Sequence, residues 1–189
     1  MANKDSAFGL RPIGKVGQNK DNQGLSEYSI AASATAIYQG DPVEMLATGT
    51  IGVAAAGDVL LGPLNGVFFT HASTSKPTFA NHLEASNTAS DIVGFVSDDP
   101  YERFEVQSNN TGASAQTDIG NVANIEYTAG SSPNYVSKVE LDDSDLATSD
   151  GQLKVIGVSK DPDNNDLSSA NVNFVVTINE HFLKQEAGI

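Results

Sequence analysis

Alternation of apolar and polar residues predicts short β-strands along most of this chain. The clearest case is the segment NVNFVVTIN at residues 171–179, where every second residue from Val172 to Ile178 is apolar and most of the others are polar. This period of two is typical of an antiparallel strand with one buried face and one face toward water. Further strands are predicted at residues 28–32, 37–45, 51–53, 59–70, 119–128, 135–141 and 152–159.

The segment IVGFVSDDPYERFEVQ at residues 92–107 predicts a β-hairpin in the middle of the sequence. Its first half is apolar, β-branched and aromatic, and an Asp-Asp-Pro turn follows at residues 98–100. Aspartate side chains bond their own backbone in turns, and proline fixes φ. After the turn, Phe104 and Val106 alternate with polar residues, so one face of the second strand is apolar.

The segment VLLGPLNGVFFT at residues 59–70 predicts two strand-like halves broken by Gly62 and Pro63. Its Val67-Phe68-Phe69 run is continuously apolar, which is expected of a strand with both faces covered. A helix over residues 54–61 is the competing prediction, but the glycines at 57 and 62 argue against it.

The overall pattern predicts a mainly β protein with little helix. Roughly eight to ten short strands separated by turns indicate an antiparallel β-sandwich or barrel, jelly-roll-like in type. The pattern does not choose between a jelly roll, a Greek-key sandwich and a smaller barrel. With 189 residues, the chain is expected to form one all-β domain at residues 28–189, preceded by an extended N-terminal arm at residues 1–27.

Residues 71–91 lack a clear period and predict a long surface loop. Structureless stretches of this length are uncommon in compact domains and often have a function. We expect Phe79 and Leu83 to be its buried side chains. The loop is either an intersubunit contact or a simple insertion.

The net charge of −14 is unevenly distributed. Residues 1–20 carry four basic side chains and one acidic one, a net charge of +3, whereas the other 169 residues carry 6 basic and 23 acidic ones, a net charge of −17. Such an acidic body repels nucleic acid and anionic membranes. The basic arm is therefore expected either to dock on an acidic surface, which is the body itself, a neighbouring copy or a separate partner, or to be a disordered terminus.

Composition excludes several classes of protein. The chain has no cysteine, which excludes a disulfide framework and thiolate chemistry. Its first residues do not resemble a secretory signal, and no apolar run approaches the roughly 20 residues of a membrane helix. We expect a soluble protein that is synthesised in the cytoplasm.

Two segments resemble known binding motifs, but each lacks residues that the motif requires. Residues 9–15 fit the phosphate-loop spacing GxxxxGK, but Val16 stands where a hydroxyl residue is needed and no strand precedes the motif. The segment DPDNND at residues 161–166 resembles a calcium loop, but the required glycine and glutamate are missing, so at most a weak calcium site is expected.

The acidic pairs at residues 98–99 and 142–143 are expected to be solvated turn residues. The three histidines form no metal-binding motif and stand at His71, His82 and His181. No enzymatic activity and no cofactor or metal are predicted.

Four segments resemble a known family: AFGLRPIGKVG at residues 7–17, IYQGDPVEM at 37–45, VLLGPLNGVFF at 59–69 and SDDPYERFEVQ at 97–107. Together they are similar to the capsid cement or decoration proteins of short-tailed marine and cyanobacterial bacteriophages. The resemblance implies a non-enzymatic virion protein on the outside of an icosahedral capsid. Its partners would be the major capsid protein and other copies of itself, commonly in a homotrimer, and it would stabilise the shell by bridging capsomers.

Five residues are the candidates for contacts with the capsid or between subunits: Phe8, Leu10, Arg11, Phe79 and Tyr101. The first three belong to the arm, and Tyr101 lies in the central turn. The alternative function is a β-sandwich adhesin or carbohydrate-binding module that uses Tyr101 or the loop at residues 71–91. A hydrolase is a third reading, and it rests only on scattered carboxylates.

Overall fold

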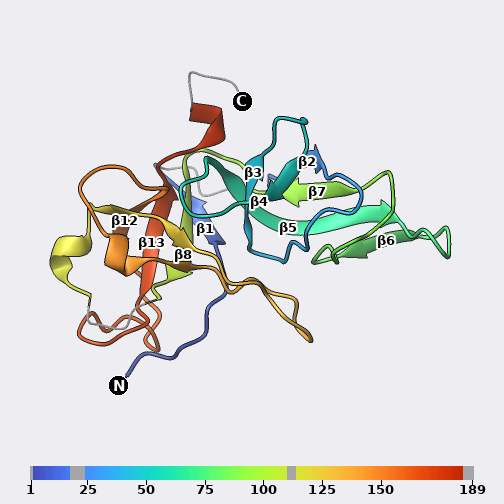
Figure 1. Ribbon diagram of the computed structural model, residues 1–189. Coiled ribbons are helices and arrows are strands. Elements are labelled where there is room, and N and C mark those ends of the chain that lie inside the picture. Colours follow the sequence, from blue (N-terminus) through green and yellow to red (C-terminus); the bar gives the residue numbers. More distant parts are fainter. Residues whose placement is uncertain (1, 18–23, 110–113, 185–189) are drawn as a thin grey trace.

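The computed structural model describes residues 2–17, 24–109 and 114–184 (Figure 1). It confirms a mainly β protein with antiparallel sheets in a sandwich-like arrangement. The strands are β1 (Arg11–Lys15), β2 (Ser26–Ser29), β3 (Pro42–Met45), β4 (Ile51–Val53), β5 (Leu60–Thr70), β6 (Pro77–Ala80), β7 (Val93–Val96), β8 (Glu102–Gln107), β9 (Val122–Ala123), β10 (Ile125–Glu126), β11 (Glu140–Leu141), β12 (Leu153–Val158) and β13 (Asn173–Ile178). Three single 3₁₀ turns are η1 (Gln116–Asp118), η2 (Asp143–Asp145) and η3 (Phe182–Lys184).

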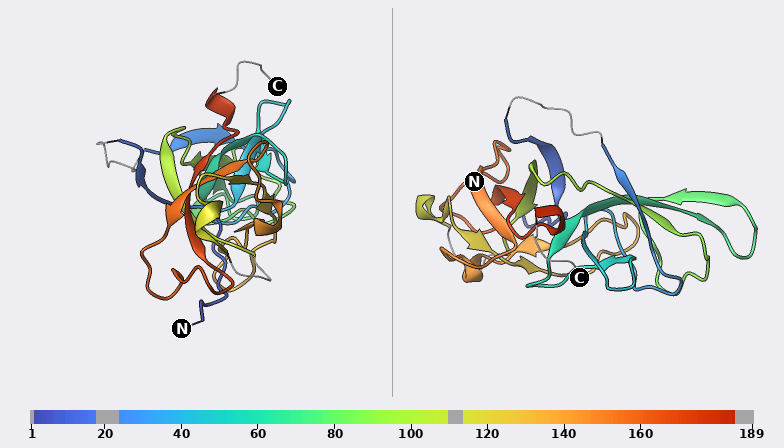
Figure 2. Two further views of the ribbon diagram at one scale, coloured as in Figure 1. Left: turned by 90° about the vertical axis from the view of Figure 1, so that its left-hand side faces the viewer. Right: turned by 90° about the horizontal axis from the view of Figure 1, so that it is seen from above.

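Two principal sheets make up the fold. The first has five strands in the order β1-β8-β13-β12-β9, and the second has six, in the order β2-β7-β5-β3-β4 with β6 added to β5. A small β10-β11 pair accompanies them. Figures 1 and 2 show the first sheet on one side of the molecule, while the far end of the second sheet, formed by β5, β6 and β7, projects from the body.

The hairpin predicted at residues 92–107 is wrong. Its two strands exist, but β7 pairs with β2 and β5 in the second sheet, whereas β8 pairs with β1 and β13 in the first. The turn between them is therefore the connection between the sheets. Local alternation predicts strands correctly, but it carries no information about which neighbour satisfies the backbone hydrogen bonds.

The hydrophobic core consists of two clusters. The first includes Phe104, Phe174 and Val176, and the second includes Ile37, Val67 and Leu83. The clusters meet at β5, where Leu60 belongs to the first and Leu61 to the second because successive residues of a strand point to opposite sides.

The break predicted within residues 59–70 is absent, because β5 is one strand of 11 residues. Its first part pairs with β3, and its later part pairs with β6 and β7. Gly62 allows this change of partners: its φ is +150°, and a Cβ atom there would lie 2.0 Å from the carbonyl oxygen of Ser97.

The basic arm docks on the protein's own body. Lys4 pairs with Asp163, Arg11 pairs with Glu105, and the Lys15 Nζ atom lies 2.6 Å from Asp99. Residues 11–15 are an edge strand of the first sheet, paired with β8, and Leu10 is only 1% exposed in the first core cluster. This part of the predicted arm therefore belongs to the β body, and the apparent phosphate-loop motif is largely a strand.

The predicted loop at residues 71–91 contains the strand β6. Leu83 is buried as expected, but the prediction for Phe79 is wrong, since its side chain is 74% exposed. The strand forms because Pro77–Ala80 pairs with the end of β5 and so satisfies its backbone in spite of a weak sequence pattern.

Candidate functional site

Three phenylalanines from neighbouring strands form an aromatic row on the outward face of the second sheet. Phe68 in β5 lies opposite Phe79 in β6, with ring centroids 4.8 Å apart, and the Phe79 ring lies 6.3 Å from that of Phe95 in β7. Phe79 is the most exposed of the three, while Phe68 and Phe95 are half-buried. Full burial of such a side chain is worth about 1.5–3 kcal/mol, so this face retains free energy for association.

The row lies on the uncovered side of the apolar run in β5. On the inner side, Val67 and Phe69 are 1% and 9% exposed, as expected for a core strand. Phe68 points outward, where it packs against the Phe79 ring and stays half-buried. The continuous apolar run predicted a strand with both faces covered, but within one molecule only its inner face is fully buried.

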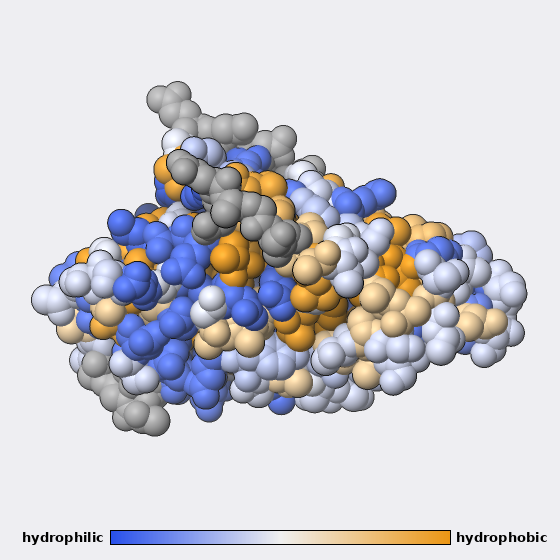
Figure 3. All heavy atoms as spheres, turned by 45° about the horizontal axis from the view of Figure 1, so that its top comes forward, coloured by the Kyte–Doolittle hydropathy of each residue, from blue (hydrophilic) through white to orange (hydrophobic). Residues whose placement is uncertain are grey.

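Ionisable residues are scarce in this part of the protein. Between Leu60 and Ala80 the sequence contains only His71 and Lys76. In a chain with a net charge of −14, such a segment can approach another surface with little charge repulsion. Figure 3 shows apolar residues at the surface in the middle of the molecule and over the second sheet.

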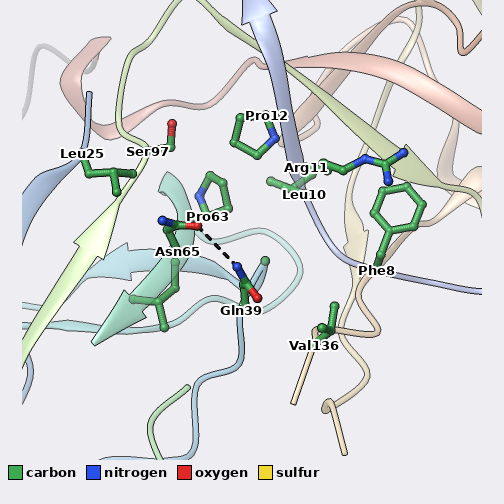
Figure 4. Close-up of a pocket in the computed structure, with 12 residues that line it drawn as sticks. Phe8, Leu10, Arg11, Pro12, Leu25, Gln39, Pro63, Asn65, Ser97 and Val136 are labelled. Atoms are coloured by element: carbon green, nitrogen blue, oxygen red, sulfur yellow. Dashed lines mark hydrogen bonds between the residues drawn. The ribbon is translucent and has the colours of Figure 1, made fainter. Parts of the chain in front are cut away.

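A junction pocket of about 470 Å³ lies near the end of β7, the strand that carries Phe95 (Figure 4). It lies where the N-terminal segment meets the second sheet, and Ser97, which lines it, is two residues beyond Phe95. Its walls are mainly apolar, with a few polar groups such as Gln39 and Asn65, which share a hydrogen bond of 3.4 Å. The lining residues include Phe8, Leu10, Arg11, Pro12, Leu25, Pro63 and Val136.

Three of the five candidate contact residues meet at this pocket. The guanidinium carbon of Arg11 lies 4.5 Å from the centre of the Phe8 ring, a cation–π arrangement (Figure 4). Arg11 also pairs with Glu105. Leu10 forms part of the pocket wall but is otherwise buried in the protein's own core. It therefore shapes the pocket, whereas Phe8 and Arg11 present more of their surface.

The other two candidates lie apart from the pocket. Phe79 belongs to the aromatic row, and Tyr101 lies in the connection between β7 and β8 with its side chain 62% exposed. The Lys184 Nζ atom lies 5.0 Å from the centre of the Tyr101 ring. One face of this ring is thus occupied by a cation from the protein itself.

The paired carboxylates of the central turn have structural partners. Asp98 accepts hydrogen bonds from Ser26 Oγ at 2.9 Å and Tyr28 Oη at 2.6 Å, and it thereby links the connection to β2. Asp99 pairs with Lys15 and accepts the backbone N–H of Tyr101 at 2.8 Å, and these contacts hold its pKa below the usual value. The two side chains thus connect the crossover between the sheets to β1 and β2.

Two buried ionisable groups lie near this crossover, and sequence reasoning did not find them. Glu102 is 1% exposed; burial raises its pKa, although Ser97 Oγ donates a hydrogen bond to it. His181 is also 1% exposed, and burial lowers its pKa to about 4. Such burial leaves a substrate no direct access to either group. Their signal in the sequence was weak, because a Glu in an alternating strand and a His near the terminus both resemble surface residues.

An aromatic stack packs the 71–91 segment against the rest of the protein. The His82 and Tyr135 rings are 3.9 Å apart and nearly parallel, and Tyr38 lies 6.2 Å from His82. All three residues are half-buried. This arrangement joins three distant segments, which no periodicity in the sequence indicates.

No group of three or more His, Cys, Asp or Glu side chains is placed to hold a metal ion within residues 2–17, 24–109 and 114–184. In the acidic segment at residues 161–166, Asn164 Nδ2 donates a hydrogen bond to the carbonyl of Lys4 at 2.7 Å, and Asp163 pairs with Lys4. The segment therefore holds the N-terminal residues in place. Over the same part of the chain, no helix has the length and hydrophobicity needed to cross a membrane.

The apolar surface formed by the aromatic row and the junction pocket is thus the best candidate for a functional site. Comparison with known proteins adds no relative: no family model, curated protein or solved structure matches this chain.

Proposed function

We propose that this protein is a structural, non-enzymatic virion protein of a bacteriophage. It is a decoration or cement subunit that binds the major capsid protein on the outside of the shell and bridges capsomers. The observation that carries this proposal is the exposed aromatic row at the projecting end of the second sheet. An exposed aromatic face is suited to contact with another protein, and the exposed carboxylate of Glu27, opposite Phe95, borders it. The resemblance of four sequence segments to capsid decoration proteins selects the shell as the partner.

The row and the pocket supply complementary parts of an interface. Aromatic residues dominate binding energy at protein interfaces, and Phe79 is the most exposed aromatic side chain of the row. The junction pocket, lined by Phe8 and Leu25, can receive an apolar side chain of the partner. Many copies attached to one shell would also gain from multivalency, since bridging makes the second contact intramolecular.

Co-sedimentation with capsids tests the proposal. Shells assembled from the major capsid protein of the encoding phage are mixed with the purified protein, and bound copies are counted after pelleting. We expect saturable binding by the natural protein and loss of binding by Phe79→Ser. The matched control is Ile156→Ser, which replaces a side chain that is 38% exposed in the other sheet. Absence of binding by the natural protein would refute the proposal.

Deletion of residues 2–20 is a poorer test, because it removes strand β1 and the core residue Leu10 together with any contact surface. Lost binding would then not distinguish a missing contact from a damaged fold. Phe8→Ser changes only a half-buried side chain at the pocket. We expect it to weaken capsid binding while its thermal melting curve stays close to that of the natural protein.

A carbohydrate-binding module is the second candidate, favoured by the exposed Phe79 ring. Ligand sites usually place polar groups beside such a ring to fix the orientation of the ligand. Phe68 lies opposite Phe79, and Val93 lies opposite Phe68, and neither offers a side-chain hydrogen bond. The polar side chain in this row is Glu27 of β2, which lies opposite Phe95. A glycan array separates the two proposals: a specific signal that Phe79→Ser abolishes would favour the sugar-binding module.

A further inference from the structure

A second groove, of about 480 Å³, crosses the outer face of the first sheet. One wall comes from β1 and the residue Gly17, and the other comes from the end of β12 with Lys160 and Asp161. Arg103 and Glu105 of β8 and Val175 of β13 also line it. The groove therefore lies away from the aromatic row, which belongs to the other sheet.

Arg103 in this groove forms no ion pair within the part of the chain that the structure describes. Its Nε atom is buried and makes no hydrogen bond. The residues opposite it on the neighbouring strands are Gly14 and Thr177, and neither carries a charge. In so acidic a chain, an arginine that pairs with no described carboxylate distinguishes this groove.

Further positive charge lies on the same face. Lys160 is exposed on the groove wall, and Lys154 lies opposite Thr177, in the same cross-strand row as Arg103. Neither lysine is in an ion pair with the described part of the chain. Lys15 differs, because it pairs with Asp99.

The nearest buried carboxylate is already satisfied. Burial would raise the pKa of Glu105, but hydrogen bonds from Ser159 and Arg11 outweigh that effect and hold its pKa below the usual value. Asn173 Nδ2 also donates to Glu105 at 3.3 Å. Glu105 therefore stays ionised with Arg11 as its counter-ion. The other carboxylate of the groove is Asp161, and no salt bridge joins it to Arg103 or Lys160 in the described part of the chain.

We propose that this groove binds an acidic segment of another protein chain. A carboxylate of the segment would pair with Arg103, whose planar fork suits two-point binding of a carboxylate, and Lys160 would add a second charge contact. Apolar side chains of the segment would pack on Ile13, which is 45% exposed, and on Val175. These apolar walls and the net charge of −14 favour a short mixed segment over a nucleic acid, whose many phosphates the body would repel.

Fluorescence anisotropy with a labelled peptide of sequence Asp-Val-Glu-Val-Asp tests the site on the full-length protein. The peptide Asn-Val-Gln-Val-Asn has the same shape without the charges. We expect saturable binding of the acidic peptide, affinity about tenfold lower for Arg103→Gln, and a several-fold loss for Lys160→Gln. Lys76→Gln, an exposed cation before β6 in the other sheet, is the matched control and should bind as the natural protein does.

Several results would overturn the proposal. The first is equal affinity for the two peptides. The second is an Arg103→Gln variant that binds the acidic peptide with the natural affinity and has an unchanged melting curve. The third is displacement of the peptide by inorganic phosphate but not by chloride at equal ionic strength. If the mass of the free protein rises with its concentration, and Arg103→Gln abolishes that rise, the partner is a second copy of this chain and not a separate protein. The site does not depend on capsid binding, so failure here leaves the result of the co-sedimentation experiment unaffected.

Discussion

Protonation of His181 should destabilise this protein in mild acid. The imidazole is 1% exposed, and its Nδ1 atom accepts the backbone N–H of Leu183 at 3.1 Å. That hydrogen bond requires the neutral ring, because a protonated imidazole is a donor at both nitrogens. The ring also lies where the C-terminal segment meets β5, since the His181 backbone bridges to Leu60.

The size of the effect follows from the pKa of His181. Burial is the largest cause of its fall from 6.5 to about 4. Because the folded-state pKa is depressed, the unfolded chain binds the proton first as the pH falls. Stability from this group is fully present above pH 6.5 and is lost between pH 6.5 and about 4. At about 1.4 kcal/mol for each pKa unit, the loss is about 3 kcal/mol.

Urea denaturation at several pH values measures this loss against His181→Asn, which keeps an acceptor near Leu183 N–H but does not titrate. We expect the unfolding free energy of the natural protein to fall by about 3 kcal/mol relative to the variant between pH 7 and pH 4. The comparison cancels the titration of other groups, which both proteins share. A difference between the two proteins that stays constant over this range would refute the reasoning, as would an imidazole pKa near 6.5 measured by NMR.

Three further predictions concern stability. Asp41 is fully buried, and burial raises its pKa from 3.8 to about 6, so its negative charge opposes folding at pH 7. The variant Asp41→Asn should therefore raise the unfolding free energy at pH 7 by up to about 3 kcal/mol. In urea titrations this gain should vanish near pH 4, where the carboxyl group is protonated in the folded protein. Gly62→Ala should cost more than about 4 kcal/mol, because its Cβ would meet Ser97. Gly14→Ala is its control, with φ +148° and nothing within 4 Å, and similar melting temperatures for the two variants would contradict the clash. Phe104→Ala, at a side chain 1% exposed, should cost about 3–5 kcal/mol in the same assay, and a loss below 1 kcal/mol would contradict its place in the core.

The candidate site was only partly predictable. Phe8, Leu10 and Arg11 were singled out together because apolar and basic residues stood out in a polar arm, and the structure brings them to one pocket. Phe79 was also named as a contact residue, but its side chain was expected to be buried, whereas it is 74% exposed. Its true position depends on the pairing of β6 with β5, which the weak pattern of residues 71–91 could not indicate.

The sequence by itself determined the fold class. Alternation with a period of two, frequent turn residues and the near absence of helical period predict antiparallel strands, because side chains alternate across a strand whatever its neighbours are. The charge distribution left two expectations for the basic arm, docking on an acidic surface or a disordered terminus. The three arm cations that the structure describes pair with Asp163, Glu105 and Asp99.

Only the tertiary structure decided which strands are neighbours. Residues 92–107 read locally as a hairpin, yet β7 and β8 belong to different sheets, because each strand is hydrogen-bonded between partners distant in the sequence. The same is true of the aromatic row, whose three rings come from three strands. It is also true of Arg103, whose Nε atom is buried without a hydrogen bond among the described residues because of what lies on neighbouring strands. Local pattern reports what a residue prefers, whereas exposure and charge compensation depend on long-range contacts that the pattern does not encode.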